Sequence, residues 1–145
     1  MPLAVVRLRA AEAADAAALA GLIEQLGYRV TPAAVAAQLA TLAQSPVDAV
    51  LVASVGPSVV GLIGCHAMDL VHIPGRLGRI TVLVVAASHR RSGLGAQLVT
   101  AAEEYFRSLG CARIEVTSGQ RRVEAHAFYT ALGFAETSKR FVKTL

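Results

Sequence analysis

The chain has 145 residues, of which 54% are hydrophobic, and its 14 Lys and Arg residues against 10 Asp and Glu residues give a net charge of +4. This length suits one domain with its own core, and we expect that domain to span residues 1–145. No stretch reaches about 18 uninterrupted apolar residues and no signal-peptide pattern is present, so we expect a cytoplasmic protein with no membrane partner. Because the basic residues form no continuous run with interleaved aromatic residues, they favour a small phosphorylated cofactor over nucleic acid.

The hydrophobic periodicity alternates between strands and helices along the chain. Thr31 and Pro32 are typical of an N-cap and a first helical position, and the Gly56-Pro57 pair is typical of a hairpin turn. In chain order, we expect a strand over 3–9, helices over 15–26 and 31–44, strands over 49–53 and 59–69, a loop over 72–78, a strand over 80–85, a helix over 94–109, a strand over 112–117, a turn over 118–120, a helix over 124–132 and a strand over 134–142.

The most informative stretch is an apolar strand that runs into a basic, glycine-containing turn and then a helix. Residues 80–85 are almost wholly apolar, whereas the turn that follows contains Arg90, Arg91, Gly93 and Gly95. The first turn of a helix offers free backbone N–H groups and a partial positive charge to an anion. The stretch therefore predicts a phosphate site, although an ordinary helix start with solvated arginines has the same pattern. It matches neither the P-loop nor the dinucleotide fingerprint, because the lysine of the first and the third glycine of the second are missing.

Three local patterns, in this order along the chain, resemble the GNAT family of N-acetyltransferases. The run Leu83-Val84-Val85 resembles the strand that pairs with the pantetheine arm of the coenzyme in that family, and Arg90-x-x-Gly93-x-Gly95 is similar to its [QR]-x-x-G-x-[GA] pyrophosphate loop. The segment from Ala125 to Phe134 resembles its A-x-x-[FLY]-Y-x-x-x-G-F motif. The resemblance covers essentially the whole chain. It implies an α/β (α+β) GNAT fold, with a mixed central sheet, helices on both faces and a splayed pair of central strands.

The resemblance also implies acetyl-CoA as the acetyl donor and assigns residues to it. Tyr129 matches the tyrosine that acts as general acid toward the coenzyme sulfur, although it could instead only pack beside Phe128. The thioester carbonyl would accept a hydrogen bond from a backbone N–H, that of Val85 or a neighbour. The residues expected to bind the coenzyme are Leu83, Val84, Val85, Arg90, Arg91, Ser92, Gly93, Leu94, Gly95, Ala96 and His126.

The general base is where the sequence departs from the commoner family pattern. Many relatives carry a glutamate at about the position of Thr81, and this chain has no carboxylate between Asp69 and Glu103. Either solvent takes the proton of the amine or a group elsewhere does. The candidates are His66, Asp69, His72 and Glu115. A second departure is Arg122, which stands where many relatives have an asparagine near the coenzyme.

The sequence shows no diagnostic metal site. His66, Asp69 and His72 could be built into one, but their spacing is not that of a known metal motif, and we interpret them as residues at the rim of a substrate site. Cys65 and Cys111 lack metal-ligand spacing and are expected to be free thiols.

These patterns predict an N-acetyltransferase that acts on a primary amine of a small molecule or peptide. Two other functions remain open at this level: a noncatalytic acyl-CoA-binding sensor of the same fold, and an RNA-associated acetyltransferase. Coenzyme binding without turnover would favour the first, and salt-dependent RNA binding would favour the second. A homodimer is plausible, but no interface can be derived.

Overall fold

The computed structural model describes residues 5–117, 123–137 and 140–145. Its elements are β1 (Val6–Ala10), η1 (Ala13–Asp15), α1 (Ala16–Glu24), α2 (Pro32–Ala43), β2 (Asp48–Val55), β3 (Ser58–Leu70), β4 (Ile73–Val85), η2 (Ala87–His89), α3 (Leu94–Ser108), β5 (Cys111–Val116) and α4 (Val123–Ala131). The strands form one sheet in the order β1-β2-β3-β4-β5. Neighbouring strands from β1 to β4 are antiparallel, whereas β5 is parallel to β4.

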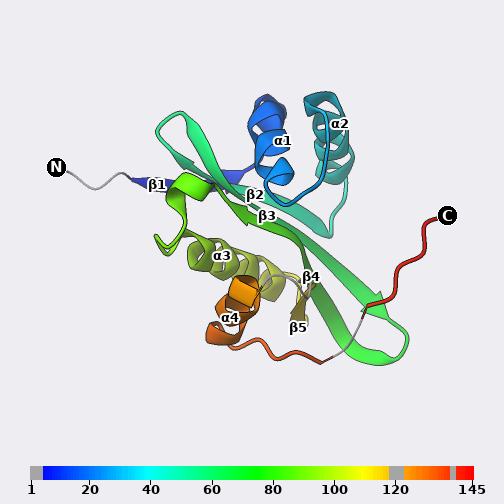
Figure 1. The fold of residues 1–145 in the computed structure, drawn as a ribbon. Helices are drawn as coiled ribbons and strands as arrows, with labels where there is room; N and C mark the ends of the chain where they lie inside the picture. The colour runs from blue at the N-terminus through cyan, green and yellow to red at the C-terminus, as the bar shows by residue number, and fades with distance from the viewer. Residues whose placement is uncertain (1–4, 118–122, 138–139) are drawn as a thin grey trace.

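Helices cover both faces of this sheet (Figure 1). One core lies between the sheet and α3, and α4 adds Phe128 to it. A second core lies between the sheet and the pair α1 and α2, with Leu19 and Leu22 of α1 packed on the side where Val52, Leu62 and Val84 project. The expected mixed sheet with helices on both faces is therefore confirmed.

The helices begin and end where the sequence signals predict. Thr31 accepts a hydrogen bond from the Ala34 N–H at 3.1 Å, and Pro32 occupies the first turn of α2. Gly110 follows the last turn of α3 with φ of 76°, a conformation that favours glycine. Among the described residues, no helix has the length and apolar character needed to cross a membrane.

A two-pronged ion pair joins the start of α1 to β1. The two guanidinium nitrogens of Arg9 donate to the two carboxylate oxygens of Asp15 at 2.8 and 2.9 Å. Asp15 also accepts the Glu12 N–H at 2.7 Å. The hydrogen bond from Arg9 lowers the pKa of the Asp15 carboxyl below its usual value, although burial opposes this shift. The charged form is thus favoured in the folded protein.

The expected loop over residues 72–78 is wrong, because β4 already begins at Ile73. Glycine and proline usually mark loops, but here Gly78 has a packing role. A Cβ at Gly78 would lie 2.6 Å from the ring of Phe106, so only glycine lets α3 approach the strand. The turn between β3 and β4 is consequently short, and the two strands form a long hairpin.

The expected last strand, over residues 134–142, is also wrong for the described part of that segment. Residues 134–137 and 140–145 have no strand assignment, and Phe141 and Val142 are 92% and 77% exposed. The polar run over residues 137–140 leaves no alternating apolar face to bury against the sheet. Three earlier expectations lie outside the described residues: Leu3 in the first strand, the turn over 118–120, and Arg122 near the coenzyme.

We predict that Phe106→Ala destabilises the fold by about 3–5 kcal/mol, because the ring is 1% exposed and fills the space above Gly78. Urea unfolding followed by circular dichroism measures the effect. Phe141→Ala is the matched control, and its change should stay within about 0.5 kcal/mol since that ring is exposed. Equal losses in both variants would contradict this account of the core.

Candidate active site

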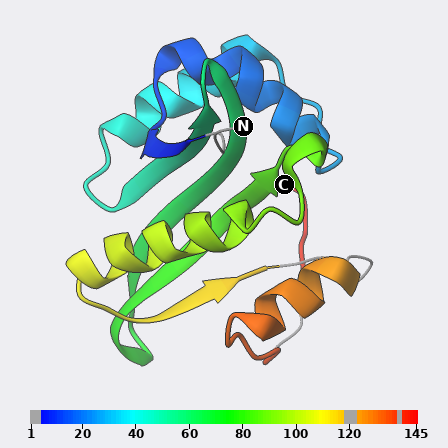
Figure 2. The same ribbon diagram turned by 90° about the vertical axis from the view of Figure 1, so that its left-hand side faces the viewer.

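A gap opens where β4 and β5 stop pairing. The register between them ends at the pair Ile80 and Val116, whereas β4 continues to Val85 with β3 as its partner. On the β3 side, Gly64 pairs with Val82 but Cys65 pairs with Ile80, so Thr81 is an extra residue. Such a bulge bends the strand and increases its twist. Figure 2 shows β5 diverging from the end of β4, as the expected splay requires.

The backbone of β4 beyond the bulge points partly into this gap. The Ala86 N–H donates to the Val60 carbonyl of β3 at 2.8 Å, which fixes the side toward which Ala86 faces. Because backbone groups alternate between the two edges of an antiparallel strand, Leu83 and Val85 face the opposite side, toward the gap. Val84 faces β3, and its side chain is buried beneath α1 and α2. Of the three residues expected to pair with the coenzyme arm, Leu83 and Val85 have the suitable direction.

The turn before α3 has the backbone shape of an anion site. Gly93 precedes the helix with φ of 80°, and Arg91 has φ of 61°, the one positive value at a non-glycine position among the described residues. No side chain caps this end of α3, which leaves its first N–H groups available to a ligand. Arg90 and Ser92 are exposed, and the Arg90 Nε donates back to the Val85 carbonyl at 3.3 Å. The turn is therefore tied to the end of β4.

The two glycines of this turn have different roles. A Cβ at Gly93 would meet nothing within 4 Å, so space does not require a glycine there. The positive φ does, because glycine adopts that conformation without strain. A Cβ at Gly95 would lie 3.1 and 3.3 Å from ring atoms of Phe128. Leu94 is 2% exposed and belongs to the core, whereas Ala96 is half-buried. Of these expected coenzyme residues, Leu94 can therefore contribute only its backbone.

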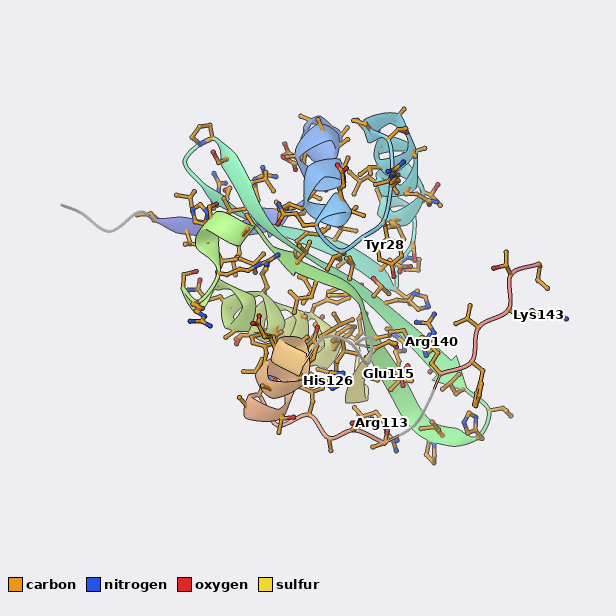
Figure 3. The ribbon with its side chains drawn as sticks, in the orientation of Figure 1. Tyr28, Arg113, Glu115, His126, Arg140 and Lys143 are labelled. Atoms are coloured by element: carbon orange, nitrogen blue, oxygen red, sulfur yellow. The ribbon has the colours of Figure 1, made fainter. Side chains whose placement is uncertain are left out.

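Helix α4 lies beside the gap and carries the two expected site residues of the C-terminal motif. The contact between Phe128 and Gly95 docks α4 on the first turn of α3. Tyr129 is half-buried, with its ring 5.3 Å from that of Phe128 and 5.6 Å from that of Phe134. His126 is half-buried and precedes Tyr129 by one helical turn. Figure 3 shows His126 on α4 and Glu115 on β5.

A row of ionisable residues crosses four strands next to the bulge. The register pairs Asp48 of β2 with His66 of β3, His66 with Arg79 of β4, and Arg79 with Glu115 of β5. We call these four residues the polar row. Asp48 lies two positions before Val50, which packs under α1 and α2, so the row is on that face of the sheet. On this face, the polar row is next to the row of Val50, Gly64 and Val82, which belongs to the apolar area that α1 and α2 cover.

Two pairs of contacts organise the polar row. The Asp48 carboxylate lies 2.8 Å from His66 Nδ1, and it also accepts the Ser45 hydroxyl at 2.5 Å. The Arg79 guanidinium donates to Glu115 Oε1 through Nε at 2.5 Å and also forms an ion pair with it. The carboxylate of Glu115 is thus held by a neighbouring cation.

The structure separates the three ionisable residues that the sequence analysis grouped. Asp69 lies 3.6 Å from Arg76 near the end of the β3–β4 hairpin, and His72 is in its turn. No group of three His, Cys, Asp or Glu residues in the described ranges could hold a metal ion. Cys65 and Cys111 are free thiols, and burial raises the pKa of Cys65 to about 12. A thiol with such a pKa is not a nucleophile at neutral pH.

Sequence reasoning gave no role to Asp48 or Arg79. Asp48 is 18 positions from His66, and only the strand register brings the two side chains together. Arg79 directly precedes the strand that the sequence analysis expected over residues 80–85. No local motif marks either residue.

The comparisons with known proteins agree on one family. Residues 18–134 match the acetyltransferase (GNAT) family. The chain is 36% identical to the aminoalkylphosphonate N-acetyltransferase of Salmonella typhimurium over 60% of this chain and 56% of that protein. It is 32% identical to the aminoglycoside N(6')-acetyltransferase type 1 of Acinetobacter haemolyticus over 43% of each. The chain thus spans about half the length of these curated relatives.

A solved structure supports the fold independently of sequence identity. The aminoglycoside N-acetyltransferase AAC(6')-Iy, in complex with CoA, superposes with a TM-score of 0.88 at 19% identity, over 99% of this chain and 97% of that one. At this identity the likeness concerns the fold. Because the family match extends over more than half of its length, the chain belongs to the acetyltransferase (GNAT) family, whose members use acetyl-CoA.

Proposed function

We propose that residues 1–145 form one acetyl-CoA-dependent N-acetyltransferase domain that acetylates a primary amine of a small molecule or peptide. The observation that carries this proposal is the gap between β4 and β5, which opens beside the anion-binding turn at the start of α3. A coenzyme with a pyrophosphate and an extended thioester arm fits a phosphate site followed by a strand with free backbone groups. Amine acceptors are supported by the names of the relatives, which act on an aminoalkylphosphonate and an aminoglycoside.

In this proposal, each part of the site has one task. The first N–H groups of α3, with Arg90 and Arg91, bind the pyrophosphate. The backbone of Leu83 and Val85 binds the pantetheine arm, and one of their N–H groups donates to the thioester carbonyl. The amine nitrogen attacks that carbonyl carbon, the carbon–sulfur bond breaks, and the Tyr129 hydroxyl gives its proton to the departing thiolate.

One observation favours a second function, a noncatalytic acyl-CoA sensor. The bulge residue Thr81 has no carboxylate, and the neighbouring Arg79 is a cation held by Glu115. An enzyme needs another group, or solvent, to take the proton of the amine. A sensor does not.

Thiol release with a panel of primary amines distinguishes the two functions. We expect one class among aminoalkylphosphonates, aminoglycosides, polyamines, amino acids and peptide N-termini to release coenzyme A thiol at a rate that saturates with amine. Tight acetyl-CoA binding in calorimetry without release on any amine would favour the sensor. No binding would contradict both functions.

Gly93→Glu should abolish acetyl-CoA binding, because the substitution adds a negative charge at the proposed pyrophosphate site and strains a positive φ. Gly110→Glu is the matched control: Gly110 has φ of 76°, against 80° at Gly93, and a Cβ there also meets nothing within 4 Å. Calorimetry should therefore show loss of binding in the first variant and near-normal affinity in the second. Equal affinities would contradict the phosphate site.

Tyr129→Phe should lower kcat by about 10²-fold while the acetyl-CoA affinity stays within a few fold, because the ring packing is kept and the proton donor is lost. Tyr105→Phe removes a hydroxyl from α3 outside the proposed site and should leave kcat unchanged. Steady-state thiol release measures both. An unchanged kcat in Tyr129→Phe would leave this residue with a packing role.

A further inference from the structure

We propose that His66, held in place by Asp48, is the group that takes the proton from the acceptor amine. This inference rests on the proposed acetyl transfer and assigns the one role in it that the strand sequence leaves open. It follows from the polar row, from the exposure of His66 and from the contacts that occupy the other candidate bases.

Asp48 holds the neutral imidazole of His66 in one tautomer. A carboxylate can only accept hydrogen bonds, so the 2.8 Å contact places the proton of the neutral ring on Nδ1. Nε2 then carries the lone pair. The Asp48 side chain is 14% exposed and is itself held by the Ser45 hydroxyl, whereas the His66 side chain is 37% exposed. A half-buried carboxylate thus orients a ring that solutes can reach.

The position of His66 relates it to the proposed reaction centre. His66 pairs with Arg79, two residues before the bulge at Thr81, and the same row ends at Glu115, one residue before β5 stops pairing. Neighbouring strands lie about 4.8 Å apart, so the whole row is within a few strand spacings of the gap. It lies on the face of α1 and α2, beyond the area that these helices bury. An acceptor on this face approaches the gap across His66.

The other candidate bases are less suitable. Asp69 lies beside Arg76, two residues before the hairpin turn that contains His72. Arg76 extends to the other face of the sheet, the α3 side, where it donates to the Leu109 carbonyl at 3.3 Å. Asp69 and His72 are therefore near the hairpin end and not in the polar row. Glu115 is paired with Arg79, so its carboxylate is already engaged in an ion pair.

The charged surroundings of His66 come from the strands. Asp48 on β2, Arg79 on β4 and, beyond it, Glu115 on β5 share its row. Helix α2, which packs over the adjoining part of this face, contains no ionisable residue. The carboxylate of Asp48 is the group in direct contact with the ring, and Glu115 is occupied by Arg79.

The proposed step is balanced. One N–H bond of the acceptor ammonium breaks, and its proton moves to Nε2 of His66. The nitrogen lone pair that this releases forms the bond to the acetyl carbon, while the electrons of the carbon–sulfur bond leave with the thiolate, which takes the proton of the Tyr129 hydroxyl. The nitrogen then loses a second proton to solvent and becomes a neutral amide, and Tyr129 regains a proton from solvent. His66 afterwards returns its proton to solvent.

The pH dependence of kcat/KM tests this role with a matched pair of histidine variants. For the wild type, we expect kcat/KM to rise with pH and level off below the pKa of the free acceptor amine, because a base on the protein takes the proton. His66→Gln should lower kcat/KM at pH 7 by about 10²-fold, and its rate should keep rising toward the pKa of the free amine. His72→Gln, at the hairpin turn, should retain the wild-type profile. Calorimetry with acetyl-CoA shows that each variant is folded.

A second variant tests the positioning role of Asp48. Asp48→Asn keeps a hydrogen-bond acceptor for Nδ1 but removes the charge that faces the ring, so kcat/KM at pH 7 should fall, by less than in His66→Gln. If His66→Gln has the wild-type profile and rate, the inference fails while the acetyl transfer stands. Absence of turnover with every amine would instead defeat the acetyl transfer, and this inference with it.

Discussion

The parting of β4 from β5 is the constraint on which the rest of the site depends. Two parallel strands that stayed paired would satisfy each other's backbone groups and leave no room for a ligand. Here one extra residue, Thr81, bends β4 after Ile80, and the pairing with β5 ends at that level. The N–H groups that the gap exposes then lie beside the turn that starts α3. In the proposed function, binding of an extended, phosphorylated coenzyme therefore depends on the backbone more than on particular side chains.

The contact between Phe128 and Gly95 connects two motifs that are separate in the sequence. Because a Cβ at Gly95 would press on the Phe128 ring, the glycine lets α4 dock on the first turn of α3. That docking brings Tyr129 to the side of the gap. The glycine pattern of the turn thus combines a backbone requirement at Gly93 with a packing requirement at Gly95, and only the first concerns the proposed phosphate site directly.

The polar row is the basis of our proposal that a chain without the usual strand carboxylate can still offer a base. Arg79 neutralises Glu115, and Asp48 orients His66, so each carboxylate of the row is committed to a neighbour. The imidazole is the member that keeps an open acceptor atom. Strand register determines which residues lie next to His66. Four separate stretches of sequence, none of which carries a motif there, therefore combine into one surface.

The sequence by itself determined the family and the succession of most elements, because these follow from local periodicity, caps and short motifs such as Arg90-x-x-Gly93-x-Gly95. From the same motif it predicted the phosphate turn. It mistook residues 72–78 for a loop and, among the described residues, 134–137 and 140–142 for parts of a strand, since glycine, proline and alternation were interpreted without their tertiary partners. Only the tertiary structure decided that Asp48 meets His66, that Glu115 meets Arg79 and that Gly78 lies beneath Phe106. The reason is physical: register and packing join residues tens of positions apart, and no local pattern encodes which of them will be neighbours.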